Sequence, residues 1–300
     1  MKRAGLLLLV AVAPVATVAA YLLSGDPDSG DVQAGERAPA TGRSYEKDKS
    51  RTEIESDEEL IADLPPGLAA PAKKELAQQL VASAENSTLN WRGQYGYIED
   101  IADGNGYTAG IIGFCTGTHD LLALVERYTK KHPDNGLARY LPALREVDGS
   151  DSHEGLDPGF VKAWKAEAAK PAFRAAQDGA RDRLYFDPAV RLAKLDGLGT
   201  LGQFIYYDAM VLHGPGTGPH GFYGLREAAL KEADTPSQGG GEKAYLDIFL
   251  DIRRKAMKQE KAHRDTSRVD TAQRRFLYDG NLALRTPLTW KVYGETFKVP

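Results

Sequence analysis

Most of the chain shows a helical spacing of apolar side chains, and one short stretch breaks that pattern. From residue 71 onward, apolar residues recur at helical spacing, as Leu76, Leu80, Val81 and Ala84 do at positions i, i+4, i+5 and i+8. This spacing places them on one face of a helix. The first predicted helix begins at residue 71 and ends at Glu85. The same pattern predicts further helices at residues 118–131, 136–146, 158–178, 187–213, 222–234, 242–262 and 269–278.

The stretch at residues 95–114 has a different character. Asp103-Gly104-Asn105-Gly106 is a strong turn signal between two short runs with strand-forming residues, which predicts a small hairpin or sheet. Acidic residues near this turn, Glu99 and Asp100 among them, alternate with aromatic residues such as Tyr97. Together with Glu85, they could form two groups of carboxylates beside a groove with aromatic walls, as glycosidic bond cleavage requires.

The N-terminal 66 residues differ from the rest of the chain. Lys2 and Arg3 precede an apolar run over residues 4–23, so residues 1–23 are predicted to be either a cleaved export signal or a retained membrane anchor. We expect secretion, with anchoring through residues 4–23 as the alternative. Residues 24–66 are polar and acidic and are predicted to be a disordered linker, which leaves 67–300 as the catalytic domain.

Charge and cysteine content exclude several classes of function. Residues 25–63 carry 12 acidic and 5 basic side chains, so this segment alone is more negative than the whole chain, whose net charge is −4. Residues 64–300 are nearly neutral, which argues against a nucleic-acid partner. Cys115 is the only cysteine and lies in an apolar run, so we expect a buried, unreactive thiol. The six histidines show no zinc-like spacing, and no metal or cofactor is expected.

A glycine-rich motif and an acidic residue on an apolar helix face are two further patterns in the sequence. Residues 216–221 match G-x-G-x-x-G, but a helix-like run precedes them and Pro219 removes an N–H, so nucleotide binding is not favoured. Asp208 lies on the apolar face of a predicted helix and therefore needs a partner. Arg253, Arg254 and Arg268 are the candidate partners.

Several long motifs resemble the bacterial chitosanases of glycoside hydrolase family 46. The resemblance covers roughly residues 70–300, and the matching segments occur in the same order with compatible spacing. The motifs that carry it are SAENSTLNW, QYGYIEDIADGNGYTAGIIGFCTGTHD, RDRLYFDPAV, LGQFIYYDAMVLHGPG and DTSRVDTAQRRFL.

This resemblance implies a fold and a reaction. The implied fold class is mainly α (α+β): a two-lobed, lysozyme-like fold with a small β-sheet or hairpin at the substrate cleft. The implied reaction is internal hydrolysis of β-1,4 linkages between glucosamine residues in chitosan, with inversion at the anomeric carbon. The expected partners are therefore chitosan or glucosamine oligosaccharides, and the enzyme is expected to be a monomer without a cofactor.

The resemblance also implies residue roles. Glu85 matches the general acid, Asp103 the general base, and Thr108 a residue that helps to hold the attacking water. Asp208, Arg253 and Arg268 match a buried charge network behind the acid. The residues that match substrate-binding positions are Tyr97, Gly113, Thr118, Asp120 and His263.

One departure and two alternatives remain open at the level of sequence. Family members often have Arg where this chain has Asn105, which leaves the positioning of the base at Asp103 undetermined. A peptidoglycan-cleaving, lysozyme-like enzyme would also use two carboxylates. A non-catalytic glycan-binding protein at the cell surface would account for the long apolar N-terminus.

Overall fold

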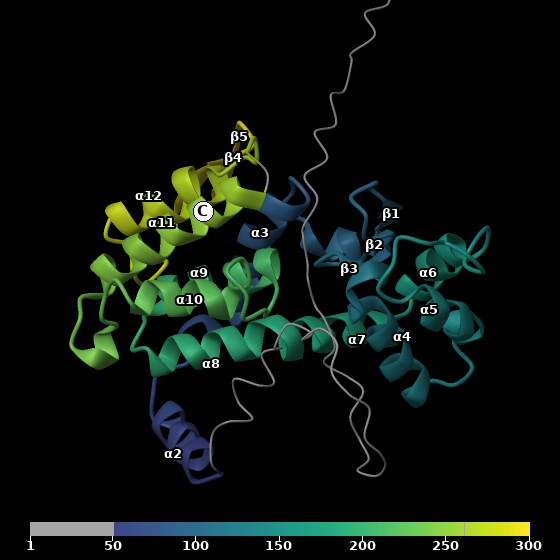
Figure 1. Cartoon of the computed structure of the whole chain (residues 1–300), viewed down its shortest axis with the longest axis horizontal. Helices are drawn as coiled ribbons and strands as arrows, with labels where there is room; N and C mark the ends of the chain where they lie inside the picture. Colours follow the sequence, from purple (N-terminus) through teal and green to yellow (C-terminus); the bar gives the residue numbers. More distant parts are fainter. Residues whose placement is uncertain (1–50, 261) are drawn as a thin grey trace, which may run out of the picture.

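The apolar helix faces meet in two lobes, which Figure 1 shows side by side. The chain is represented here by a computed structural model that describes residues 51–260 and 262–300. The predicted signal or anchor at 1–23 and the first part of the predicted linker, 24–50, lie outside the described residues. The prediction of a mainly helical protein with a small antiparallel sheet is confirmed.

The first lobe holds the small sheet and the helices around it. Its sheet has the order β1-β2-β3 and is antiparallel throughout, with Ile98 opposite Ala109 and Thr108 opposite Cys115. Its elements are η2 (Trp91–Gly96), β1 (Ile98–Asp100), β2 (Tyr107–Ala109), β3 (Phe114–Cys115), η3 (Thr116–Thr118), α4 (Asp120–Lys131), η4 (Ala138–Tyr140), α5 (Leu141–Val147), α6 (Phe160–Ala168) and α7 (Pro171–Arg181).

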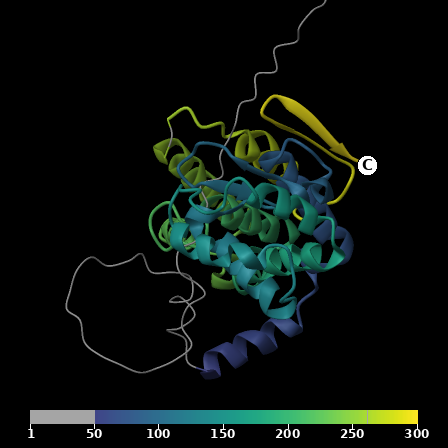
Figure 2. The same cartoon turned by 90° about the vertical axis from the view of Figure 1, so that its right-hand side faces the viewer.

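The second lobe is built from helices and a C-terminal hairpin. The hairpin pairs β4 with β5 and lies at the edge of the molecule, as Figure 2 shows. The elements of this lobe are η1 (Gly67–Ala69), α3 (Pro71–Glu85), α8 (Asp187–Leu195), α9 (Thr200–His213), α10 (Phe222–Leu230), η6 (Pro236–Gln238), α11 (Glu242–Glu260), η7 (Arg268–Gln273), α12 (Arg274–Tyr278), β4 (Leu288–Val292) and β5 (Glu295–Val299).

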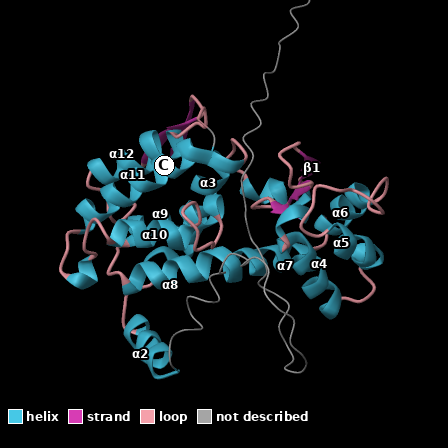
Figure 3. Ribbon diagram, viewed as in Figure 1, coloured by secondary structure: helices cyan, strands magenta, loops and turns pink. Residues whose placement is uncertain are grey.

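A nearly continuous helical segment joins the two lobes. Helix α7 is followed without a break by the π-helical stretch η5 (Asp182–Phe186), and η5 is followed directly by α8. Figure 3 shows this segment along one side of both lobes. Pro188 lies near the start of α8 and has no N–H to donate, which is compatible with the irregular hydrogen bonding just before it. The spacing between the lobes is therefore set by helical backbone rather than by a loop.

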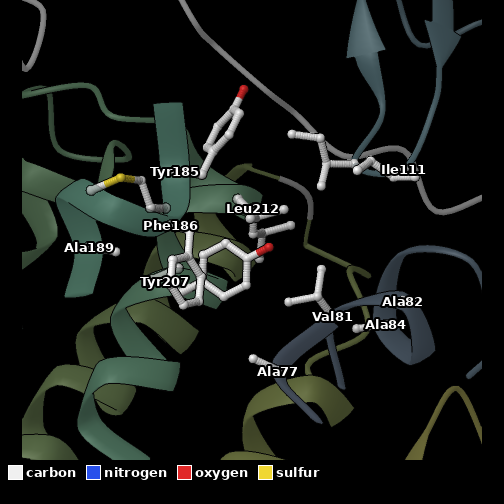
Figure 4. Packing of buried hydrophobic residues seen from close by; sticks show 14 of the residues in the cluster. Ala77, Val81, Ala82, Ala84, Ile111, Tyr185, Phe186, Ala189, Tyr207 and Leu212 are labelled. Carbon is white, nitrogen blue, oxygen red and sulfur yellow. The ribbon is translucent and has the colours of Figure 1, made fainter. Parts of the chain in front are cut away.

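Side chains from three elements pack where this segment meets α3. The Phe186 and Tyr207 rings meet edge to face, with their centroids 5.1 Å apart. Figure 4 shows these rings beside Ala77 and Val81 of α3. All four residues are buried, and the Tyr207 hydroxyl donates to the Gln78 side chain at 2.8 Å. Helix α3 is thereby fixed along its length, and so is the residue at its C-terminal end.

Two predicted helices are each divided in the structure. The prediction of one helix at 158–178 is wrong, because the chain becomes extended at Lys170 and Pro171 starts a new helix. The prediction of one helix at 187–213 is wrong as well. Gly197 has a φ of +76°, in the left-handed region that interrupts a helix, and α9 begins only at Thr200.

Two elements were absent from the predictions. A helix, α2 (Arg51–Ala62), lies within residues 24–66, the segment predicted to be a linker, and contacts α8 through an ion pair between Asp57 and Arg191 at 3.4 Å. The C-terminal hairpin places Trp290 in the core, where its indole N–H donates to Ser83 Oγ at 2.9 Å. Among the described residues, no helix combines the length and apolarity that crossing a bilayer needs.

Candidate active site

Glu85 is the last residue of α3, and its side chain faces the interior of the protein. The apolar face of the helix, including Leu80 and Ala84, holds it against the second lobe. Ser87 has a φ of +50°, so the chain turns away immediately afterwards. The Glu85 side chain is only 6% exposed, and its Oε1 atom lies 2.7 Å from Nη2 of Arg268. A carboxyl group in this position has little contact with solvent and one dominant charged partner.

Arg268 also pairs with a second carboxylate. Its Nη2 atom donates to Oδ1 of Asp208 at 2.8 Å. The other oxygen of Asp208 accepts from Arg253 Nη2 and Gln273 Nε2, each at 2.6 Å. The structure thus places two of the three predicted arginines on Asp208, whereas Arg254 pairs with Asp270 at 3.0 Å. Two guanidinium groups and two carboxyl groups therefore form one buried network.

The network determines which of its members are charged. Burial opposes ionisation of Asp208, but Arg268 and Arg253 outweigh it and hold the pKa of Asp208 well below its usual value. Burial likewise opposes the charge on Arg268, yet Asp208 and Glu85 raise the pKa of Arg268 well above its usual value. Burial lowers the pKa of Arg253 to about 10, so that side chain remains cationic at neutral pH.

His213 contacts this network through Arg253 and was not identified from the sequence. Burial, together with the neighbouring Arg253, lowers the pKa of His213 well below its usual value, so the imidazole is neutral. Its Nε2 atom accepts a hydrogen bond from Nε of Arg253 at 3.3 Å. Gln273, which also contacts Asp208, was missed as well. An uncharged polar residue in a helix gives no sequence signal of the residue that it will contact.

Asp103 lies in the turn between β1 and β2, in the other lobe. Its two carboxylate oxygens accept separate hydrogen bonds, both from Asn105: Oδ1 from the backbone N–H and Oδ2 from the side-chain amide, each at 3.0 Å. The turn packs closely against η3, since a Cβ on Gly106 would lie 2.3 Å from Thr116 Oγ1. Asn105, the residue that departs from the family pattern, therefore holds Asp103 at both oxygens.

Thr108, Thr118 and Asp120 surround the single cysteine. Thr108 Oγ1 lies 3.3 Å from Cys115 Sγ, and Asp120 Oδ1 accepts from Cys115 N and Thr118 Oγ1, each at 2.8 Å. Burial and the Asp120 charge raise the pKa of the Cys115 thiol to about 12. The expected buried thiol is confirmed. Asp120 is 2% exposed, and burial raises its pKa to about 6.

The remaining predicted substrate-binding residues lie in different surroundings. Tyr97 is half-buried, and its hydroxyl donates to Glu99 at 3.3 Å. Burial and the Glu99 charge raise the pKa of Tyr97 to about 12, and the Asp103 charge contributes as well. Gly113 lies in the turn before β3, where its carbonyl accepts from Cys115 Sγ at 3.2 Å. His263 is exposed in the segment after α11.

Tyr293 is a further residue that the sequence analysis missed. It lies in the turn between β4 and β5 with a φ of +51°, which is unusual for a bulky residue. Its backbone N–H donates to Ser267 Oγ at 2.9 Å, which ties the hairpin to the segment just before Arg268. Burial raises the pKa of Tyr293 to about 12, and the Glu85 charge adds to that effect. The alternation around Tyr293-Gly294 is a hairpin signal that could have located it.

The two carboxyl groups differ in their surroundings. Glu85 is enclosed and held by an arginine whose charge Asp208 shares, whereas Asp103 lies in a half-buried turn and is held by an amide. Such a difference suits two groups with opposite tasks in proton transfer. Within the described residues, no group of three or more His, Cys, Asp or Glu side chains is arranged to hold a metal.

Comparisons with known proteins identify relatives over most of the chain. Residues 79–288 match the sequence profile of glycosyl hydrolase family 46. A chitosanase from Streptomyces sp. (strain N174) is 59% identical over 233 residues, which cover 78% of this chain and 84% of that protein. A chitosanase from Nocardioides sp. (strain N106) is 56% identical over the same number of residues, with the same coverage.

Solved structures give the same result. The co-crystal structure of chitosanase OU01 with substrate has a TM-score of 0.76 and 54% sequence identity, and the match covers 78% of this chain and 99% of that one. The Gynuella sunshinyii chitosanase in complex with chitotetraose has a TM-score of 0.70 and 32% identity, with coverage of 76% and 97%.

We predict that Asp208→Asn lowers the free energy of unfolding by about 3–5 kcal/mol at neutral pH, because it leaves two buried guanidinium groups without their shared carboxylate. The lowered pKa of Asp208 means that its stabilising effect is complete above its ordinary pKa and is lost as the pH falls. The difference between wild type and variant should therefore shrink below about pH 4.

Urea unfolding at a series of pH values measures this difference. Asp134→Asn is the control, since Asp134 is exposed and should change stability by less than about 0.5 kcal/mol. A difference that is small at neutral pH, or that grows in acid, would contradict the role given to Asp208.

Proposed function

The chain belongs to glycosyl hydrolase family 46, and from this premise we propose that it cleaves internal β-1,4 bonds between glucosamine units of chitosan with inversion at the anomeric carbon. That it is a chitosanase-type glycoside hydrolase with a lysozyme-like fold follows from the family and its relatives. The observation that supports the mechanism is the contrast between the arginine-held Glu85 and the amide-held Asp103.

In this proposal Glu85 is the general acid. The reaction requires a proton for the glycosidic oxygen as the bond breaks, so the acid must be protonated when substrate binds. An arginine 2.7 Å away would favour the ionised form if its charge were unopposed. Asp208 takes up part of that charge through its own contact with Arg268. Arg268 can then orient Glu85 without enforcing its ionisation.

Asp103 is the general base. It removes a proton from the water that attacks the opposite face of the sugar, and Thr108 helps to hold that water. Asn105 fixes both oxygens of Asp103, which limits the rotation of the carboxylate. Inverting enzymes separate their two carboxyl groups by about 6.5–9.5 Å to admit a water. Placing the acid on α3 and the base on the turn of the small sheet allows such a separation.

Acidic side chains on the first lobe would recognise the ammonium groups of the substrate. Tyr97 and Glu99 form one such group, and Asp120 forms another with Thr118 and the backbone N–H of Cys115, whose thiol contacts the Gly113 carbonyl. The raised pKa of Asp120, about 6, means that its charged form predominates only above that pH. A substrate ammonium would shift the balance towards the carboxylate. His263, exposed beyond α11, is proposed as an outer contact.

The cellular setting is also part of the proposal, and residues 1–50 lie outside the described part of the chain. We propose that residues 1–23 direct secretion, that residues 24–66 connect them to the catalytic domain at 67–300, and that the enzyme acts as a monomer. Extracellular action fits a polymeric substrate that cannot enter a cell. The structures of relatives with substrate or chitotetraose support a glucosamine oligosaccharide as the ligand.

The direct test combines two variants with product analysis. Glu85→Gln and Asp103→Asn should each reduce cleavage of a defined glucosamine hexamer by about 100- to 10,000-fold, because each removes one proton-transfer partner. Binding of the hexamer, followed by calorimetry, should persist in both. Glu146→Gln is the control, since Glu146 is exposed on α5. NMR of the wild-type reaction should show new reducing ends as the α-anomer; β-anomers would contradict inversion.

A separate prediction concerns Asn105. Asn105→Ala removes the side-chain hydrogen bond to Asp103 Oδ2 and keeps the backbone bond to Oδ1. A hydrogen bond to a charged group contributes about 1.5–3 kcal/mol, so kcat should fall about 10-fold or more, with little change in the Kd for the oligomer. Asn105→Arg restores the residue common in the family and should retain activity. An unchanged kcat in Asn105→Ala would show that the side chain does not position the base.

A further inference from the structure

A cavity of about 280 Å³ lies between α4 and α7, and none of its lining residues belongs to the site described above. One wall comes from α4, whose residues Leu124, Arg127, Tyr128 and Lys131 recur at the spacing of a single helix face. The opposite wall comes from α7, where the facing residues are alanines and Gly179. A Cβ built on Gly179 meets nothing within 4 Å, so the small residues leave open space.

The charged groups of this cavity are all cationic. Arg127 and Lys131 line it from α4, and Arg183 lines it from η5. No acidic side chain lines it. The acids adjacent in sequence to lining residues are engaged elsewhere. Glu126 pairs with Arg145 at 2.8 Å, Asp178 with Arg181 at 3.0 Å, and Asp182 with Lys74 at 2.8 Å. Three cations therefore converge on one cavity without a counter-charge among its lining residues.

Arg183 is the innermost of these cations. Its Nη1 atom donates to the Gly179 carbonyl at 3.1 Å, and its Nε atom is buried without a hydrogen-bond partner. Arg127 and Arg183 line the same cavity, and burial together with the charge of Arg127 lowers the pKa of Arg183. A buried donor without a partner and two like charges in proximity both cost free energy. An anion in the cavity would offset the second cost, the repulsion between the like charges that line it.

We propose that this cavity binds a tetrahedral oxyanion, a phosphate or sulfate group, either free or carried by a small sugar ester. Guanidinium groups match the oxygens of such groups with paired hydrogen bonds, and Lys131 adds a third positive charge. The volume is just below the range of about 300–1,000 Å³ that is typical of small-molecule pockets, which fits a compact ligand. The alanine wall would contact the uncharged part of an ester. The polycationic substrate would be repelled here, so the cavity is separate from substrate binding.

Arg183 also belongs to the π-helical stretch that joins the lobes. A ligand that satisfies Arg183 in the folded protein, and has no such site in the unfolded chain, stabilises the fold. The expected signature is therefore a rise in Tm that saturates with ligand concentration.

The test is differential scanning calorimetry of the full chain, which measures the Tm. Sodium chloride keeps the ionic strength constant. Inorganic phosphate, sulfate and glucose 6-phosphate are each titrated into wild type and into Arg127→Gln/Lys131→Gln. Lys130→Gln/Arg139→Gln is the matched control, because it removes the same charge from exposed positions of the same lobe. Chitosan cleavage by each variant shows that it is folded.

We expect a saturable rise in Tm for wild type and control, and loss of that rise in Arg127→Gln/Lys131→Gln. A response to inorganic phosphate or sulfate assigns a free ion, and a response to glucose 6-phosphate alone assigns an ester. The proposal is overturned if wild type responds to none of the three anions, or if Arg127→Gln/Lys131→Gln responds as strongly as wild type.

Discussion

One guanidinium group, that of Arg268, is shared between two carboxyl groups, and the arrangement of the second lobe depends on it. Nη2 of Arg268 lies 2.7 Å from Glu85 and 2.8 Å from Asp208. These residues come from η7, α3 and α9, and Arg253 adds α11 through the other oxygen of Asp208. Four elements that are distant in sequence therefore meet at one buried charge. Removing any charge would leave the others uncompensated, which is the costliest way to disturb a buried network.

This network gives stability and reactivity a common origin. A buried ion pair rarely stabilises a fold more than apolar packing would, so its presence indicates a task beyond stability. In the proposed mechanism that task is to orient Glu85 at the end of α3, while the opposing charge of Asp208 limits the electrostatic effect of Arg268. Asp103 is held differently, by hydrogen bonds from the neutral amide groups of Asn105. The two carboxyl groups are therefore held by chemically different partners, a guanidinium group for Glu85 and an amide for Asp103.

The sequence predicted those features that rest on local signals. The helix that ends at Glu85 and the turn at Asp103 follow from periodicity and from a glycine-rich turn, and both are present. Pairing of Asp208 with an arginine followed from the cost of burying a charge, although the choice between Arg253, Arg254 and Arg268 required tertiary structure.

Other features depend on contacts that the sequence does not encode locally. The helix breaks near Gly197 and Pro171 lie inside runs whose apolar period continues, so periodicity alone spans them. The double hydrogen bond from Asn105 arises from a turn geometry that its identity does not reveal.

The most direct test of the role given to Asp208 is the pH dependence of kcat for Asp208→Asn, with Asp208→Glu as the charge-conserving control. The account predicts that the alkaline limb moves to lower pH in Asp208→Asn, because unopposed arginines favour the ionised Glu85, which cannot donate a proton. An alkaline limb at the wild-type position would contradict it.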